Sequence, residues 1–431
     1  MKRRTLQLLL LAAISSSSAM GQSTTPQIDC TTGAVSQKLV CEFPFATGLF
    51  ANASALGGGT GQANAQQVAT SLNIAIATQV SQLPLSSASA GVVLVYKNGV
   101  PETFYDLGPI LTDRGQTIGR HKFFLGFTAS QFVFTDIDGV PLGKLPFTYF
   151  RSAYNSSGAF VSNTYTTETT NLSFRINQFI GVATFGLTDK VDLSVIVPSE
   201  KVMLSDSTSA PTNYVVDAGN NLLFQYGGTA AHFPGSASGV GDVNVNLKAV
   251  LWRRERATFS AAGNVRAPTG DHLNLLGSGA WGFNPYIVYS YLAPVSPHLK
   301  IGYQWNTASE LDNPTNVRGN NQKLPGGLQY DLGADWAANR RFTVAAALLG
   351  NQYLNAPKLL TANTAIKGVP GGFLPTSTTQ NSSYSINNVS TGFKWNPAGG
   401  LVLSANVLFQ INNVGLRARP TPLVGISYKF K

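Results

Sequence analysis

Few residues of this chain have the types and spacing that a reactive or metal-binding site requires. The four histidines, His121, His232, His272 and His298, are scattered, and their spacing matches no metal site. The G-x-S-x-G, P-loop and H-E-x-x-H motifs do not occur. A hydrolase would need a serine beside a histidine, and His272 with Ser278 is the candidate pair. Because polar loop residues account for this pair more simply, we expect no catalytic residue, no metal and no cofactor.

Charged side chains that alternate with apolar ones form a second group of interest. An Arg or Lys that faces lipid at mid-membrane costs about 2–4 kcal/mol, so in a membrane strand such residues should face an aqueous interior. The predicted lumen-lining residues are Arg175, Lys248, Arg266, Lys300, Arg341, Lys429, Asp192, Asp242, Asp331 and Asp335. Since bases outnumber acids in this set, we expect an inward positive potential that favours anions or electron-rich solutes.

The two cysteines and the N-terminus indicate the compartment. Residues 2–4 are basic, residues 6–14 are apolar, and small residues at Ala19 and Gly21 favour cleavage before Gln22. This pattern predicts a secretory signal peptide over residues 1–21. In an oxidising compartment the close pair Cys30 and Cys41 is expected to form a disulfide.

Composition indicates the kind of scaffold that would position these residues. Only 12% of the 431 residues are charged, 43% are hydrophobic and 43 are glycine, whereas soluble domains are about 25% charged. The apolar and aromatic content argues against disorder. Beyond the N-terminus no run of 18 apolar residues suggests a membrane helix. The charges are spread rather than clustered with aromatics, so we expect no nucleic-acid partner. An all-β chain with polar and apolar residues in alternation remains, which is typical of a transmembrane β-barrel.

From residue 119 onward the alternation becomes regular and predicts an antiparallel barrel of about twelve strands. The expected strands cover residues 119–135, 172–186, 190–204, 240–252, 256–267, 279–293, 297–307, 327–337, 340–352, 384–396, 400–411 and 420–430. Each is long enough to cross a membrane, which takes about 9–11 residues. Fourteen strands are the alternative, if residues 91–96 and a split of residues 119–136 each add one.

The connections and the tryptophans support the same architecture. Short turns alternate with longer loops, of which 136–171, 205–239, 308–326 and 353–383 are the longest, as in barrels with periplasmic turns and extracellular loops. The predicted interface girdle consists of Trp252, Trp336 and Trp395 at periplasmic strand ends and Trp281 and Trp305 near extracellular ends. A soluble β-sandwich would not sort its loops by length in this way.

Residues 22–118 have a mixed character that sets them apart from the barrel region, 119–431. Residues 62–83 have helical composition and end before Pro84, and residues 91–96 with Asn98 and Gly99 resemble a short strand and a turn. We expect this segment to be either a periplasmic extension or a plug inside the barrel, and the sequence does not distinguish the two.

The order of several short motifs resembles that of the outer-membrane family named for the meta-pathway of phenol degradation. The motifs are residues 113–120 (DRGQTIGR), 184–194 (TFGLTDKVDLS), 239–243 (GVGDV), 266–271 (RAPTGD) and 276–279 (LGSG). The resemblance covers about residues 119–431. It implies a β-barrel transporter with distant kinship to fatty-acid-type channels, and it carries no catalytic residues. From the residues alone, each motif is more simply a turn or a bend than a substrate site.

Together these observations predict an outer-membrane channel or transporter for passive uptake of small molecules that are aromatic, hydrophobic or anionic. We expect a bacterial outer membrane as the location after signal-peptide cleavage. The expected partners are outer-membrane lipid, the small solute and the barrel-assembly machinery, which would read the alternating C-terminal strand near Phe430. The alternatives are a non-transporting structural or adhesive surface barrel and an outer-membrane lipid hydrolase. The oligomeric state is open.

Overall fold

The computed structural model describes residues 30–41, 72–80, 93–97, 100–104, 107–230, 232–309, 311, 323–369 and 371–430 of the chain. Most of these residues lie in β-strands, and the strands form one large sheet and one separate two-stranded sheet. No helix among the described residues is long and apolar enough to cross a membrane.

The large sheet closes into an antiparallel barrel, because its last strand pairs with its first. Leu423 of the last strand lies opposite Ser130 of the first. The wall has twelve strands, as the sequence predicts. They are β3 (Phe123–Ile137), β6 (Phe160–Gly186), β7 (Val191–Thr208), β11 (Val243–Arg254), β12 (Ala257–Ala267), β13 (Gly282–Tyr291), β14 (Val295–Asn306), β15 (Gly327–Asn339), β16 (Phe342–Ala365), β17 (Phe373–Ala398), β18 (Leu401–Gln410) and β20 (Thr421–Lys429).

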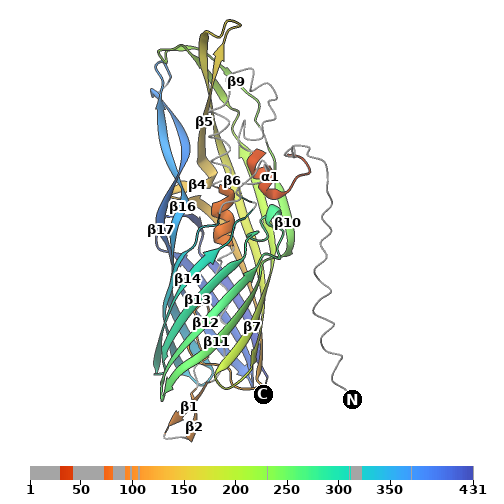
Figure 1. The fold of residues 1–431 in the computed structure, drawn as a ribbon, viewed down its shortest axis with the longest axis vertical. Coiled ribbons are helices and arrows are strands. Elements are labelled where there is room, and N and C mark those ends of the chain that lie inside the picture. Colours follow the sequence, from red (N-terminus) through yellow and green to blue (C-terminus); the bar gives the residue numbers. More distant parts are fainter. Residues whose placement is uncertain are drawn as a thin grey trace.

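The fourteen-strand alternative is wrong. The predicted strand at residues 91–96 is present as β1 (Val93–Lys97), but β1 pairs with β2 (Val100–Phe104) in the separate hairpin. Figure 1 shows this hairpin below the barrel, near the C-terminus. The predicted turn residues between the two strands lie outside the described residues. Residues 123–137 form a single strand, so the expected split of residues 119–136 adds no further strand to the wall.

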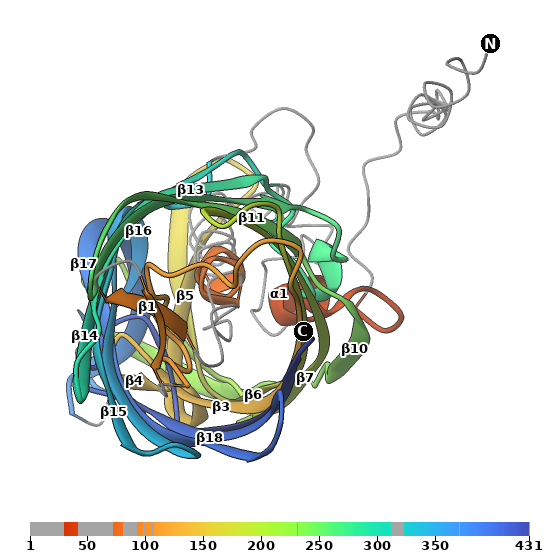
Figure 2. The ribbon, with the colours of Figure 1, turned by 90° about the horizontal axis from the view of Figure 1, so that it is seen from below.

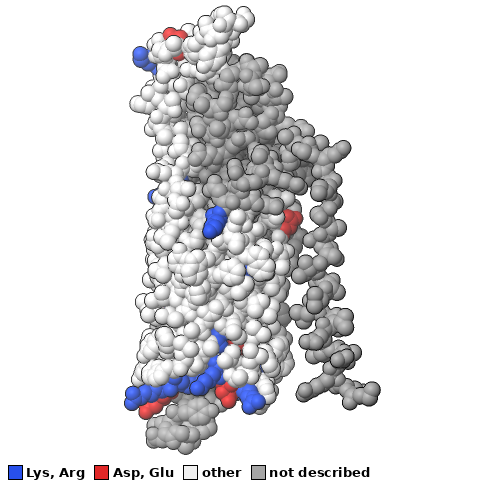
Figure 3. Space-filling model, in the orientation of Figure 1, with Lys and Arg blue, Asp and Glu red and all other residues white. Residues whose placement is uncertain are grey.

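The outer surface of the barrel is a broad apolar belt. In β13 buried and exposed residues alternate without a break, and Phe283, Ile287 and Tyr289 are among the exposed ones. On the side that Figure 3 shows, most of the wall is uncharged, and most of the Lys, Arg, Asp and Glu residues lie at its lower end, with a few higher up. An apolar belt bounded by charged ends matches the hydrocarbon layer of a membrane and its two interfaces.

The two ends of the barrel differ, and we call them the short-turn end and the long-loop end. At the short-turn end the strands are joined by tight turns such as the one between β7 and β6, closed by the Leu187 N–H donating to the Val191 carbonyl. Three of the four predicted long loops, 136–171, 205–239 and 353–383, are mostly strands, so expecting loops there was wrong, and most of the fourth, 308–326, lies outside the described residues. β6 continues beyond the wall and pairs with β5 (Leu145–Tyr154) and β8 (Thr212–Val216).

The projecting strands at the long-loop end form ribbons that rise above the wall (Figure 1). β8 also pairs with β9 (Leu222–Gly227), and β16 and β17 continue to pair between Ala356–Ala365 and their partners. Both faces of such a ribbon are partly exposed to water, so its strands contain many polar residues. In the sequence these strands therefore resemble polar loops. The remaining short elements here are β4 (Val140–Pro141), η2 (Leu142–Lys144), β10 (Gly235–Val240), η3 (His272–Asn274) and β19 (Leu416–Ala418).

Parts of the N-terminal segment, residues 72–80 and 107–118, lie inside the barrel, whereas α1 (Val35–Cys41) packs on η3 and β10 at the long-loop end. The expected disulfide between Cys30 and Cys41 is present, and it closes a loop that carries α1. Residues 72–80 are helical, within the range predicted. Seen along the barrel axis, this helix (orange) lies inside the ring of strands (Figure 2). Leu72 and Ile76 belong to one buried apolar cluster with Phe134 of the wall.

Candidate functional site

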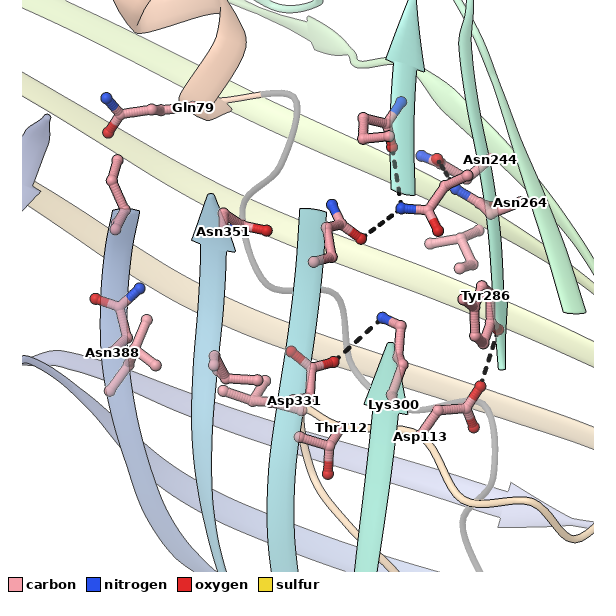
Figure 4. Close-up of a pocket in the computed structure, with 18 of the residues that line it drawn as sticks. Gln79, Thr112, Asp113, Asn244, Asn264, Tyr286, Lys300, Asp331, Asn351 and Asn388 are labelled. Atoms are coloured by element: carbon pink, nitrogen blue, oxygen red, sulfur yellow. Dashed lines mark hydrogen bonds and ion pairs between the residues drawn. The ribbon is translucent and has the colours of Figure 1, made fainter. Parts of the chain in front are cut away.

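A cavity of about 240 Å³ lies inside the barrel. Its lining comes from the wall strands and from two parts of the N-terminal segment, Gln79 of the helix and residues 111–113. Figure 4 shows Thr112 and Asp113 approaching from one side and polar side chains of the wall from the other. The cavity therefore exists only where the N-terminal segment and the barrel meet.

One feature of this lining is its content of carboxamides. Each strand from β11 to β18 contributes at least one asparagine or glutamine, and we call this set the amide belt. Its members are Asn244, Asn246, Asn264, Asn284, Gln304, Gln329, Asn351, Asn388 and Gln410. The cross-strand register explains why they meet, since Asn246 lies opposite Asn264 and Asn264 lies opposite Asn284. The belt is a product of register as well as of composition.

Three of the five basic residues that line the cavity, Lys248, Arg266 and Lys300, are paired with a carboxylate, and the other two are Arg417 and Arg419. Lys248 Nζ lies 3.2 Å from Asp113 Oδ1, and Lys300 Nζ lies 3.2 Å from Asp331 Oδ2. Arg266 Nε lies 3.5 Å from Oδ2 of Asp242, a residue that is not part of the lining. Lys300 also lies over the ring of Tyr286, 4.9 Å from its centroid. The lining contains five basic side chains and three carboxylates, those of Asp113, Asp192 and Asp331, so its basic residues outnumber its acidic ones.

The structure places the predicted lumen residues in three groups. Lys248, Arg266, Lys300, Asp192 and Asp331 line the cavity. Asp242 and Asp335 are buried at other points of the inner face, and Lys429 lies half-buried at the short-turn end of β20. The two remaining residues, Arg175 and Arg341, do not face the lumen.

Arg175 and Arg341 are corrections to the sequence-based set. Arg175 is exposed, while its neighbours Phe174 and Ile176 are buried in the apolar cluster with the N-terminal segment. An apolar interior at this level turns the arginine outward. Arg341 is exposed in the turn between β15 and β16, where its N–H donates to Asn339 Oδ1. It precedes the strand because β16 begins at Phe342.

The predicted girdle tryptophans all lie on the outside of the barrel near strand ends. Trp252, Trp336 and Trp395 lie towards the short-turn end, and Trp281 and Trp305 towards the other. Each is about half exposed. Large half-exposed indoles at two levels are the arrangement that membrane interfaces favour.

Residues 107–118 run along the inner face and are bound to several wall strands. Lys394 Nζ donates to the carbonyls of Leu107 and Pro109, at 3.3 and 2.5 Å. At Gly115, the N–H donates to Ser290 Oγ (2.8 Å) and the carbonyl accepts from Ser260 Oγ (2.5 Å). Polar groups from three strands thus satisfy a stretch of backbone that would otherwise be buried without partners. We call residues 107–118 the lumen segment.

The lumen segment also explains two motifs of the sequence. The Ile118 N–H donates to Asp192 Oδ2 at 2.9 Å, and the Thr117 hydroxyl donates to the Asp189 carbonyl at 2.8 Å. The motif at 113–120 and the motif at 184–194 therefore bind each other at the short-turn end. From the sequence, 184–194 alone was expected to be a hairpin turn, which it is, and its second role required the fold.

Three other motifs meet at Asp242. Its carboxylate accepts the Gly270 N–H (3.2 Å), the Ser278 N–H (2.8 Å) and the Ser278 hydroxyl (2.6 Å), besides facing Arg266. A side chain at Gly277 would strike Asp242 Oδ1, so the loop can pass here only as glycine. We call this group the Asp242 cluster. It pins the loop after β12 to the start of β11.

The structure also shows what the candidate hydrolase residues do. The Ser278 hydroxyl is fully buried and donates its one proton to the Asp242 carboxylate at 2.6 Å, with the Ala280 carbonyl also within reach at 3.0 Å, so it is committed to the Asp242 cluster. A different histidine, His298, has a hydroxyl and a carboxylate beside it. Its Nε2 lies 2.5 Å from Thr112 Oγ1 and its Nδ1 lies 3.6 Å from Asp335. This group is buried and joins the lumen segment to β14 and β15.

Among the described residues, no group of three His, Cys, Asp or Glu lies close enough together to hold a metal ion. The lining residues that sequence reasoning missed are Asp113 as a charge partner, Tyr286, Arg417, Arg419 and the amide belt. Alternation had marked several of the amides as inward-facing, but nothing in the sequence showed that they would lie around one cavity.

Glu168 gives the projecting ribbon a pH dependence that can be measured. It lies where β6 pairs with β5 beyond the wall, and it is 5% exposed. Burial raises the pKa of Glu168 to about 8 from its usual 4.5. Between these values the folded ribbon holds a proton that the unfolded chain releases, so this contribution to stability is present below pH 4.5 and lost as the pH rises to about 8.

We therefore expect the amides of β5 and of the first part of β6 to exchange with deuterium faster, relative to the intrinsic rate, at pH 8 than at pH 5. Glu168→Gln should remove most of this difference. Asp217→Asn is the control and should leave the difference unchanged, because hydrogen bonds from Asn221 hold the pKa of Asp217 below its usual 3.8, outside the range from pH 5 to pH 8. Equal pH dependence in the wild type and Glu168→Gln would contradict the assignment.

Part of the chain matches a model of a known protein family. Residues 150–347 match the family model described as "Putative MetA-pathway of phenol degradation". The resemblance drawn from the sequence is confirmed over this part of the chain. No curated protein matches the sequence.

Several solved structures are similar in shape. The COG4313 outer membrane channel from Pseudomonas putida F1 is 15% identical, with a TM-score of 0.44, over 73% of this chain and 98% of that one. A Pseudomonas aeruginosa FadL homologue is 10% identical, with a TM-score of 0.29, over 73% and 90%. The outer membrane channel DcaP of Acinetobacter baumannii is 8% identical, with a TM-score of 0.28, over 72% and 96%.

Proposed function

We propose that this chain, part of which matches the family of the phenol-degradation pathway, is an outer-membrane channel through which small solutes diffuse. The observation that carries the proposal is a closed barrel with an apolar outer belt and a polar interior cavity. In this reading the short-turn end faces the periplasm and the ribbons face outward. Residues 1–21 are removed as a signal peptide before the barrel is assembled into the membrane.

The lumen segment is the plug in this proposal. Its hydrogen bonds to β12, β13 and β17 hold it beside the cavity. A solute can cross only when the segment shifts, so the closed form conducts little. Each neutral hydrogen bond contributes about 1 kcal/mol. Single substitutions should therefore shift the equilibrium between the closed and the open form measurably.

The proposal predicts that loosening the segment raises conductance. Ser260→Ala with Ser290→Ala removes both hydrogen bonds to Gly115, about 2 kcal/mol in total, and should raise the open probability roughly thirtyfold. Single-channel recording of the purified full chain in planar bilayers measures this directly. Thr184→Val with Ser194→Ala is the matched control, because it removes a hydrogen bond between two wall strands only.

A non-transporting surface barrel is the second candidate. It is favoured by the ordered ribbons at the long-loop end and by a lumen that contains a bound segment. The same recordings separate the two. If neither the wild type nor the Ser260→Ala, Ser290→Ala variant conducts, the channel proposal fails and the surface role becomes the better account.

A further inference from the structure

A polar and basic patch interrupts the outer surface of the barrel where the apolar belt ends towards the long-loop end. On β13 and β14 this boundary has the half-exposed indoles of Trp281 and Trp305. On the neighbouring strands β3, β6, β7 and β10 it has amides, hydroxyls and two cations instead, each exposed or partly exposed. We call these residues the wall patch, and they are Gln131, Arg175, Asn177, Ser199, Lys201 and Ser238.

Alternation and register place the wall patch on the outside and bring its members together. On β6 and β7 its residues alternate with residues such as Ile176 and Val202, which belong to the buried apolar cluster inside the barrel. Across the strands, Asn177 lies opposite both Gln131 and Lys201, and Lys201 lies opposite Ser238. The Gln131 Nε2 donates to Asn177 Oδ1 at 2.9 Å. A continuous polar row therefore crosses four strands.

The two cations of the wall patch are close neighbours. Arg175 lies opposite Met203, two positions from Lys201 on the same face of β7, and such diagonal neighbours are about 7–8 Å apart. Neither side chain forms an ion pair or a hydrogen bond with another residue in the part of the chain that the structure describes. The carboxylates of β7 are all buried on its inner face, at Asp192, Glu200 and Asp206. A countercharge must therefore come from outside the wall.

The surface next to the wall patch, on the side of the short-turn end, is apolar and aromatic. Phe179 is 50% exposed and stacks on Phe127, with ring centroids 5.8 Å apart. Phe179 also lies opposite Ser199, so the polar row and the aromatic pair adjoin. All wall-patch residues except Arg175 line a shallow groove together with Phe179 and Val424. An amphiphile with an anionic head and apolar chains matches this order of surfaces.

The number of cations favours a phosphomonoester over a phosphodiester. A phosphomonoester carries about −1.5 to −2 charges at pH 7 and presents three acceptor oxygens, which suits two adjacent cations. Arginine is well shaped to hold such a group through two parallel hydrogen bonds. A phosphodiester, as in phosphatidylglycerol, carries a single charge. The amides and hydroxyls of the polar row both donate and accept hydrogen bonds, as the hydroxyls of a sugar do.

We propose that the wall patch binds a phosphorylated glycolipid of the outer membrane leaflet. The phosphomonoester lies between Arg175 and Lys201, the sugar lies on the polar row, and the acyl chains cover Phe127 and Phe179. This inference rests on the proposed function for the orientation of the barrel in the membrane, but it does not require conduction. It also gives Arg175, which the sequence places in the lumen, a role on the opposite face.

Native mass spectrometry of the purified protein in detergent micelles tests the proposal. The probes are bisphosphorylated lipid A, the same lipid after removal of its phosphates, and phosphatidylglycerol. Lipid A should bind roughly tenfold more tightly than either of the other lipids. Equal or tighter binding of one of them overturns the proposal. An equimolar amount of inorganic phosphate should leave lipid A bound, whereas displacement would show a free-phosphate site and overturn it as well.

A double substitution locates the binding in the wall patch. Arg175→Gln with Lys201→Gln removes two exposed charges and should weaken lipid A binding roughly thirtyfold, while binding of the dephosphorylated lipid changes little. Arg254→Gln with Arg256→Gln removes two exposed cations at the short-turn end and is the matched control. Mobility on unheated gels shows that both variants are folded. Equal weakening in the two variants, or no weakening in either, overturns the proposal.

Single-channel recording separates this inference from the channel proposal. If lipid A binds through the wall patch but neither the wild type nor the Ser260→Ala, Ser290→Ala variant conducts, the channel proposal fails and the lipid site stands. If the channel conducts but the wall-patch variant binds lipid A as the wild type does, the lipid site fails and the channel stands.

Discussion

Asp242→Ala should lower the free energy of unfolding by about 3–5 kcal/mol, the usual cost of removing one partner of a buried ion pair. The carboxylate is 5% exposed and accepts three hydrogen bonds while facing Arg266. Without it the guanidinium stays buried and the Gly270 and Ser278 N–H groups lose their acceptor. Urea unfolding of the barrel in detergent, followed by its change of mobility on unheated gels, measures the effect.

A control for this prediction lies in the same loop. Asp271 is exposed and its carboxylate accepts only from Asn274, so Asp271→Ala should cost about 1 kcal/mol or less. The double variant Asp242→Ala, Arg266→Met should recover part of the loss, because it removes the unpaired charge. If Asp242→Ala is no less stable than Asp271→Ala, the Asp242 cluster does not hold this end of the barrel together.

Asp331→Asn should increase the preference of the proposed channel for anions. Lys300 then keeps its charge beside the cavity without a partner, and a unit charge at about 8 Å in a medium of effective dielectric constant about 20 contributes about 2 kcal/mol. Allowing for screening by salt, we expect the anion-to-cation permeability ratio to rise roughly tenfold. The reversal potential under a KCl gradient at low ionic strength gives this ratio.

The opposite change supplies the control. Lys300→Met leaves Asp331 unpaired and should shift the reversal potential in the cation-selective direction. Lys201→Met removes a charge from the exposed outer face and should leave it unchanged. Shifts of the same sign in Asp331→Asn and Lys300→Met would mean that the Lys300–Asp331 pair does not govern the path of the ions.

The wall of the barrel could be predicted from the sequence because its period is local. In β13 each residue's face follows from its neighbours one and two positions away, and the two membrane interfaces select tryptophan. The ribbons were harder. β16 continues from Phe342 to Ala365 without a change that the sequence marks, so residues 353–365 looked like the start of a loop.

Charges and packing inside the barrel could not be predicted, because they depend on a segment far away in the sequence. Asp113 neutralises Lys248 across 135 positions of chain, and no local pattern reveals such a pair. Arg175 was assigned to the lumen because the interior was assumed to be wet at every level. The helix at residues 72–80 makes that level apolar and reverses the rule.

Lys248 and Asp192 are oppositely charged neighbours on the wall whose closest partners both belong to the lumen segment. They lie directly opposite each other on β11 and β7, yet Lys248 binds Asp113 and the Arg114 carbonyl, and Asp192 accepts the Ile118 N–H. In the proposed open form, departure of the lumen segment would take Asp113 from Lys248 and the Ile118 N–H from Asp192 together, and the two side chains could then pair with each other. The wall thus offers a substitute ion pair for the contacts it gives up. Such an exchange of partners makes an element bistable, with release costing less than the sum of the bonds that hold the closed form.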